Sequence, residues 1–294
     1  MDETALAYER LIENLVAWAN AQDDVRAAVV IGSRARSDHP ADRWSDLDVL
    51  IVASDPQRYW LTADWLAAVG TPWLTFTEPT FDGGLERRVL FAGGLDVDFA
   101  FLPLDVARQM AGTALPPDVA DILRRGARVL VDKDGLVAQF RPSEATMPTA
   151  QPPTQVEFLE VVHDFWYHAV WTAKHLRRGE LWWAKGGCDN HLKGLLRRML
   201  EWHAHATKGP DCDTWMRGRF LEEWADGRAV EQLRHAFAHY DEADVWRALV
   251  ATMELFRWVA LETAGRWGYP YPALGDERAT ELVYRLQAEG SLAL

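Results

Sequence analysis

The stretch SDLDVLIVAS, residues 45–54, decides the fold because it has the pattern of a strand that carries two acids on one face. Side chains alternate along a strand, so Asp46 and Asp48 point the same way, and the opposite face is apolar, with Leu47, Val49 and Ile51. Two carboxylates this close repel each other unless a cation lies between them. Oxygen ligands suit Mg²⁺, which also binds substrate phosphates, so the stretch predicts a sheet with a magnesium-binding end.

A second acidic strand is predicted in LDVDFAFL, residues 95–102, where Asp96 and Asp98 share one face. An unpaired carboxylate in so apolar a strand is costly, and a role for Asp98 as a third metal ligand would remove that cost. Two alternatives for Asp98 remain open: the general base for an acceptor hydroxyl, and a structural ion pair with an arginine. Asp96 is interpreted as a neighbour that other groups satisfy.

Upstream of these acids, AAVVIGS, residues 27–33, predicts a buried strand that ends in a Gly-Ser turn. Gly32 would let the backbone approach a phosphate closely, and Ser33 offers it a hydroxyl and an N–H. Arg34 and Arg36 are placed to neutralise a triphosphate, with ordinary surface arginines as the alternative. Metal ligands, a phosphate-binding turn and an acceptor hydroxyl are the components of phosphoryl-type transfer.

The rest of the chain divides in character near residues 141–155, a linker-like stretch rich in Pro, Thr and Ala. Before it, helices are expected over residues 6–19 and 58–69, and a hairpin across Gly93 and Gly94. After it, the helical period dominates. We therefore expect an α/β domain, residues 1–140, with a mixed sheet flanked by helices, and an all-α helical-bundle domain, residues 156–294.

The composition narrows the possible partners. The 294 residues carry a formal net charge of −13, which opposes nucleic-acid binding and favours cationic ligands. Two cysteines in no metal-ligand pattern fit a reducing compartment. Because no leader-like or transmembrane-length apolar run is present, we expect a cytoplasmic protein that does not bind membranes, and a monomer.

The motif of a Gly-Ser turn, a D-x-D strand and a later strand acid resembles the DNA polymerase beta-like nucleotidyltransferases. Longer segments are similar to the aminoglycoside 6-adenylyltransferase family, namely VLVDKDGLVAQ, the run PTQVEFLEVVHDFW and its continuation, LRRMLEW after Asp189-Asn190, and GYPYP. The resemblance implies adenylylation of a streptomycin hydroxyl by ATP with Mg²⁺, expected as two ions. Asp46 and Asp48 match the D-x-D acids and Asp98 the third acid, which would also contact the acceptor.

The chain departs from the family pattern at the glycines around Gly83 and Gly93, in the additional Asp96, and in its 15 tryptophans. These differences bear on the substrate more than on the reaction. In the helical domain, Lys174 is a candidate to reach the triphosphate, with a surface lysine as the alternative.

Other candidates of the helical domain would contact the cationic substrate. Asp189 and Asn190 are expected to begin a helix, where they would bind the substrate or serve only as an N-cap. Asp164 and Glu160 are further candidate acids, whereas Glu180 fits a solvated helix face better. The aromatic residues that would stack on adenine or a sugar, or else pack in the core, are Trp166, Tyr167, Trp182 and Trp183.

Rival functions remain open. A lincosamide or a protein hydroxyl would accept AMP by the same chemistry. Arg198 and His203 have the R-x-x-x-x-H spacing of helical ribonuclease domains, but Arg234 and His239 repeat that spacing and the net charge opposes RNA. A non-catalytic binding module is disfavoured by the intact acids. A zinc site at His203, His205 and Cys212 is rejected because no second ligand pair has suitable spacing.

Overall fold

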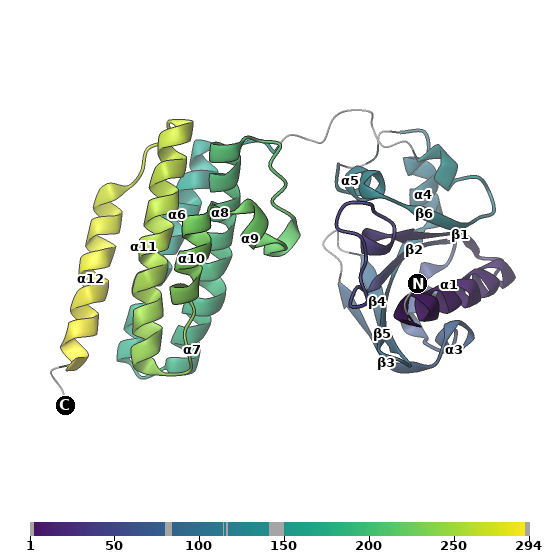
Figure 1. Cartoon of the computed structure of the whole chain (residues 1–294), viewed down its shortest axis with the longest axis horizontal. Helices are drawn as coiled ribbons and strands as arrows, with labels where there is room; N and C mark the ends of the chain where they lie inside the picture. The colour runs from purple at the N-terminus through teal and green to yellow at the C-terminus, as the bar shows by residue number, and fades with distance from the viewer. Residues whose placement is uncertain (1–2, 80–83, 114, 116, 141–149, 292–294) are drawn as a thin grey trace. The chain divides into compact units, whose positions relative to one another are not determined.

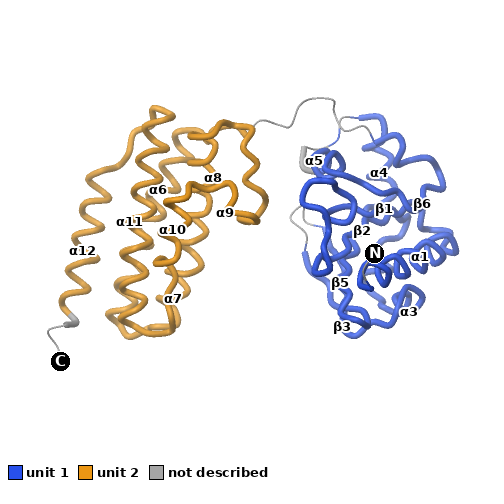
Figure 2. Tube along the Cα trace, viewed as in Figure 1, with its two compact units in different colours: residues 1–147 blue, residues 148–294 orange. Residues whose placement is uncertain are grey.

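The computed structural model describes residues 3–79, 84–113, 115, 117–140 and 150–291. The chain divides into two compact units, residues 1–147 and 148–294 (Figure 2). Most of the predicted linker and Gly83 lie outside the described residues. No described helix is long and apolar enough to cross a membrane.

The first unit is built on a six-stranded mixed sheet of the described strands, in the order β3-β4-β5-β2-β1-β6 (Figure 1). Among these described strands, only the β2–β5 pairing is parallel, and the other neighbours are antiparallel. The strands are β1 (Val25–Ile31), β2 (Leu47–Ala53), β3 (Pro72–Pro79), β4 (Leu85–Phe91), β5 (Leu95–Pro103) and β6 (Arg128–Asp132). The expected hairpin is present as β4 and β5, with Gly93 and Gly94 both at positive φ in its turn.

Helices cover both faces of this sheet, as the expected fold class requires. One face packs against α1 (Glu3–Ala21), α2 (Pro56–Leu61) and α3 (Leu66–Val69). The other face packs against α4 (Leu104–Met110), residues following it, and the short turn η2 (Val137–Gln139). The helix α5 (Pro117–Arg125) precedes β6. The apolar face of β2 lies in the first of these cores, with Leu47, Val49 and Ile51 at most 1% exposed.

The helix predicted over residues 58–69 is wrong as a single element, since residues 62–65 separate α2 from α3. Thr62, the residue after the last of α2, is extended, and its hydroxyl donates to the carbonyl of Arg58 within that helix. The break lets Trp65 stack on Trp18 of α1, with ring centroids 4.7 Å apart. Tertiary packing of a large aromatic ring has therefore overridden the helical period.

The second unit is helical, as expected for this part of the chain (Figure 1). Its elements are α6 (Gln155–Arg177), α7 (Leu181–Gly186), η3 (Gly187–His191), α8 (Leu192–Lys208), η4 (Met216–Gly218), α9 (Leu221–Trp224), α10 (Gly227–Ala236), α11 (Glu242–Trp267) and α12 (Ala273–Ser291). Thr154 begins α6 with a capping box to Glu157. The core lies among α6, α8 and α11, where Phe165 and Phe256 stack with centroids 3.6 Å apart.

The segment η3 is a π-helical turn that joins α7 to α8 without a break. Asp189 and Asn190 therefore lie inside a helical run and not at its start, which corrects the prediction. The side chain of Asp189 pairs with Lys185 and Lys193, one turn away on either side, instead of capping a helix. A π turn widens the helix locally and re-aims the residues that follow it.

Candidate active site

The parallel pairing of β2 and β5 brings two predicted acids side by side. Asp48 and Asp98 are register partners, so their side chains leave the sheet on the same face. Asp46 directly precedes β2 and has the same orientation as Asp48 along the chain. One carboxylate oxygen from each of these three residues lies within 4.8 Å of the others, and all three side chains are partly buried. The sequence therefore predicted this juxtaposition, and the register explains it.

The Gly-Ser turn lies against this acid trio, which we define as Asp46, Asp48 and Asp98. Gly32 has φ +70°, and a Cβ there would overlap the Oδ2 atom of Asp48 and lie 3.0 Å from its Cγ. Only glycine fits here, for both conformational and steric reasons. The next residue, Ser33, has a hydroxyl oxygen that is buried and has no hydrogen-bond partner among the described residues. A buried hydroxyl of this kind is suited to a ligand oxygen.

An arginine that the sequence analysis missed joins the trio from β4. Arg88 is the register partner of Asp98, and their side chains approach to 3.3 Å. The same guanidinium contacts Glu78 at 2.7 Å and Glu86 at 2.6 Å. The alternation of LERRVLF, opposite Asp98 in the predicted hairpin, was the signal that would have identified Arg88. The ion pair that was held open as an alternative for Asp98 is thus present beside the acid trio.

Burial governs the protonation of Asp98. Burial raises the pKa of that carboxyl to about 6. The positive charge of Arg88 acts in the opposite direction and lowers this pKa. The carboxylates of Glu86, Asp46 and Asp96 raise it further. Proximity of like charges and burial both therefore favour proton uptake by Asp98. Asp96 itself is exposed, and its backbone bonds to the hydroxyl of Tyr8.

Two arginines expected at the triphosphate have other partners. The guanidinium of Arg34 donates to the carbonyls of Asp46 at 2.9 Å and Ser45 at 2.6 Å, and it lies 3.5 Å from the ring centroid of Tyr8. Arg36 donates to the carbonyl of His39 at 3.0 Å. Arg34 therefore fixes the loop that carries Asp46 into the trio. A phosphate-binding role for either arginine stays a prediction.

In the helical unit, the predicted residues line two separate pockets. Lys174 is exposed and borders a cavity of about 380 Å³ together with Trp166, Tyr167 and Trp171. Trp166 is only 4% exposed, and its indole N–H donates to the hydroxyl of Tyr271, so it is chiefly a core residue. Trp182 and Trp183 are exposed on α7.

The second cavity, of about 690 Å³, is acidic and is bordered by Glu157, Glu160 and Asp164 of α6. Asp164 also contacts two histidines, His168 and His191. Of the other candidates, Asn190 is exposed, and Glu180 pairs with His175 and Arg178.

Asp189 departs from the sequence expectation. Its partners are the two lysines, of which Lys193 is 9% exposed. Lys193 also donates to the hydroxyl of Thr252 at 2.8 Å. Asp189 therefore neutralises a buried cation inside the unit. This is a structural role, whereas a carboxylate that binds a cationic substrate would have no lysine partner of its own.

The histidines of the ribonuclease-like spacing and of the rejected zinc site have protein groups as partners. Buried His203 pairs with Glu262 at 3.1 Å, while Arg198 borders the acidic cavity. His205 bonds to the backbone carbonyl of Cys212 at 3.1 Å. In the second match to the R-x-x-x-x-H spacing, Arg234 pairs with Glu231 and His239 pairs with Asp244.

A mixed sheet with acids on adjoining strands beside a glycine-serine turn defines a nucleotidyltransferase domain. The chain belongs to the streptomycin adenylyltransferase family, whose model matches residues 7–286. It is 24% identical to the aminoglycoside 6-adenylyltransferase of Staphylococcus aureus, over 90% of this chain and 93% of that protein. The corresponding Campylobacter jejuni protein is 23% identical, over 91% of each chain.

The likeness to solved structures is weaker than the likeness to these sequences. The crystal structure of an aminoglycoside 6-adenyltransferase from Bacillus subtilis has a TM-score of 0.45 at 18% identity, over 94% of this chain and 97% of that one. The family assignment thus comes from the sequence match. The chemistry available at the site comes from the acid trio and the turn beside it.

Proposed function

We propose that this adenylyltransferase moves AMP from ATP to a hydroxyl of a streptomycin-like aminoglycoside and releases pyrophosphate. The acid trio beside Gly32 and Ser33 is the observation that carries the proposal. Membership in the streptomycin adenylyltransferase family supports the donor and the acceptor class. The relatives are named aminoglycoside 6-adenylyltransferases, which agrees with an aminoglycoside as the acceptor.

The trio fits Mg²⁺. Its donors are carboxylate oxygens within 4.8 Å of one another, the ligands that this ion prefers. Gly32 leaves beside Asp48 a space that any Cβ would fill, and the hydroxyl of Ser33 has no partner there among the described side chains. We assign two ions to Asp46, Asp48 and Asp98. When bound, Mg²⁺ supplies charge neutralisation for the triphosphate and for the departing pyrophosphate.

The residues of the chain orient the reactants and move one proton. The backbone at Gly32 and the hydroxyl of Ser33 hold phosphate oxygens of ATP. Asp98 accepts the proton of the acceptor hydroxyl, whose oxygen forms a new bond to the α-phosphorus as the bond to the β-phosphate oxygen breaks. Arg88 favours the ionised form of Asp98, the form that can accept a proton.

The acceptor is a cation in this proposal, and the chain is suited to it. The formal net charge of −13 attracts cationic ligands from a distance. In the helical unit, Glu157 and Glu160 border the cavity of about 690 Å³, which is in the size range of small-molecule sites. We assign the guanidinium and amino groups of the drug to these carboxylates.

The test is incubation of the protein with ATP, Mg²⁺ and a panel of aminoglycosides and lincosamides, followed by mass spectrometry. We expect an AMP adduct on streptomycin and an equal amount of pyrophosphate. An adduct on lincomycin alone would replace the proposed acceptor with a lincosamide. No adduct on any drug, with ATP intact, would contradict the proposed function.

A further inference from the structure

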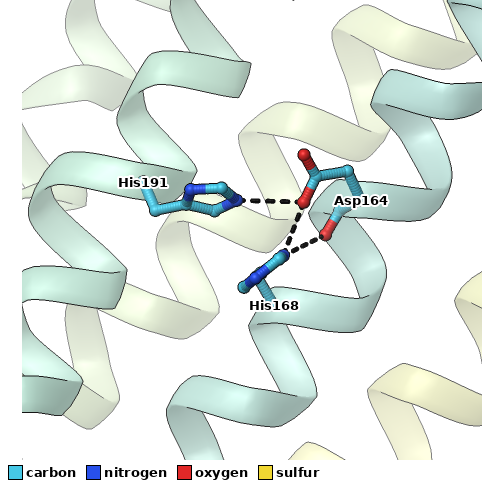
Figure 3. Close-up of side chains that lie close together, drawn as sticks. All are labelled: Asp164, His168 and His191. Atoms are coloured by element: carbon cyan, nitrogen blue, oxygen red, sulfur yellow. Dashed lines mark hydrogen bonds and ion pairs between the residues drawn. The ribbon is translucent and has the colours of Figure 1, made fainter.

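Two histidines and an aspartate of the helical unit gather where α6 meets the π turn. The Oδ1 atom of Asp164 lies 2.5 Å from Nδ1 of His168 and 2.9 Å from Nε2 of His191 (Figure 3). One ligand atom from each of the three residues lies within 4.8 Å of the others. We propose that this cluster, which we call the His-Asp-His cluster, binds one divalent transition-metal ion, with Zn²⁺ as the first candidate.

Local structure explains why these side chains meet. Asp164 and His168 are four residues apart on α6, so they lie on one face of the helix, the spacing by which helices commonly present two metal ligands. His191 closes the π turn η3. Gly187 at the start of that turn packs so tightly that a Cβ would lie 2.7 Å from the hydroxyl of Thr172 and 2.8 Å from the ring of Trp171. This close approach brings His191 to α6.

The separations fit a metal centre. Ligands about 2.1 Å from a tetrahedral Zn²⁺ ion are about 3.4 Å apart, so side-chain shifts of less than about 1 Å would open the cluster around the ion. The imidazole rings of His168 and His191 already lie with centroids 3.9 Å apart. Small rotations at the helix surface suffice, because all three side chains are 30–44% exposed. That exposure also gives the ion an entry path.

The donor types select the metal. Imidazole nitrogen is a ligand for zinc, copper, nickel and iron, whereas Mg²⁺ and Ca²⁺ take oxygen ligands. Two histidines and one carboxylate also form the protein ligand set of open zinc sites, in which a further position remains for water or a ligand. The His-Asp-His cluster therefore differs in chemistry from the all-carboxylate trio of the first unit.

The inference does not depend on the proposed function, because no residue of the trio takes part in it. It does change the assignment of Asp164, whose carboxylate would hold the ion instead of a cationic group of the drug. Asp164 also borders the cavity of about 690 Å³. The bound ion would therefore lie at the margin of that cavity, on the unit expected to hold the acceptor.

The experiment measures Zn²⁺ affinity by competition with a chromophoric chelator, on full-length protein stripped of metal and kept in excess Mg²⁺. We expect one Zn²⁺ per chain in the wild type, and at least a tenfold loss of affinity in each of His168→Ala and His191→Ala. His163→Ala is the matched control, since His163 is exposed on the same helix but outside the cluster. Asp48→Asn, in the first unit, should bind Zn²⁺ as the wild type does.

Thermal unfolding supplies a second readout. Zn²⁺ should raise the Tm of the wild type and of His163→Ala, and not that of His191→Ala. Asp164→Asn preserves the side-chain shape and should also lose Zn²⁺ binding. Wild-type affinity in both histidine variants would overturn the inference and leave a hydrogen-bonded cluster only. Loss of the Zn²⁺ site in Asp48→Asn would overturn it too, by placing the ion at the trio.

Discussion

Replacing Gly32 with alanine tests how the turn supports the acid trio. A Cβ at this position would lie 2.1 Å from the Oδ2 atom of Asp48, so the carboxylate must move by more than about 1 Å to reach ordinary contact distance. A displacement of about 1 Å at a reacting centre costs about 100-fold in rate. We therefore expect Gly32→Ala to lose at least that much adenylyltransferase activity.

The same substitution also strains the backbone, and a matched glycine separates the two effects. Gly32 has φ +70°, and alanine in this left-handed region costs about 1–2 kcal/mol. Gly94 has φ +74°, and no atom of the described residues lies within 4 Å of where its Cβ would be, so Gly94→Ala suffers the strain without the clash. Both variants should show the decrease in Tm that the backbone strain causes, Gly32→Ala at least as large a decrease as Gly94→Ala because of the added clash, and only Gly32→Ala should lose activity.

The assay is AMP transfer to streptomycin, followed by pyrophosphate release and by mass spectrometry of the drug, beside a thermal melt of each variant. Metal affinity of the trio, measured with Mn²⁺ as the probe, should weaken in Gly32→Ala and not in Gly94→Ala. Equal activity in the two variants would refute the reasoning, because it would mean that the turn does not fix the Asp48 carboxylate.

Three further predictions follow from the charged and buried groups. Burial raises the pKa of Asp98 to about 6 and Arg88 lowers it, so Arg88→Met should move the acidic limb of the kcat/KM profile to higher pH. An unmoved limb would exclude Asp98 as the base. Asp189→Asn should destabilise the protein by about 3 kcal/mol, measured by denaturant unfolding, with an unchanged KM for streptomycin. A raised KM at unchanged stability would restore the substrate role. Burial raises the pKa of Cys188 to about 11, so a thiol reagent at pH 8 should label Cys212 alone, and equal labelling by mass spectrometry would contradict this.

The strands and their acids were predictable because short-range alternation carries the information. The pattern around Asp46 and Asp48 gave both the strand and the face of its carboxylates, and the same logic placed Asp98. Sequence spacing could not supply the parallel register that sets Asp48 opposite Asp98. Nor could it supply the antiparallel register that brings Arg88 to the same place, because strand pairing is a long-range property.

Interpretation failed where tertiary contacts override local preference. The helix expected over residues 58–69 is interrupted because Trp65 packs against Trp18. Asp189 looked like a helix start, yet its carboxylate neutralises Lys185 and Lys193 in the middle of a helical run. The His-Asp-His cluster has no comparable local pattern, since His168 and His191 are 23 positions apart in the chain and the π turn that carries His191 has no clear sequence signature.

The measurement closest to the central claim compares Asp48→Asn with Asp96→Asn in AMP transfer to streptomycin. Both acids lie on the same face of adjoining strands, but Asp96 is exposed and lies outside the trio. We predict no detectable AMP-streptomycin from Asp48→Asn and near wild-type yield from Asp96→Asn, with both proteins folded by circular dichroism. Wild-type yield from a folded Asp48→Asn would contradict the claim that the trio performs the transfer.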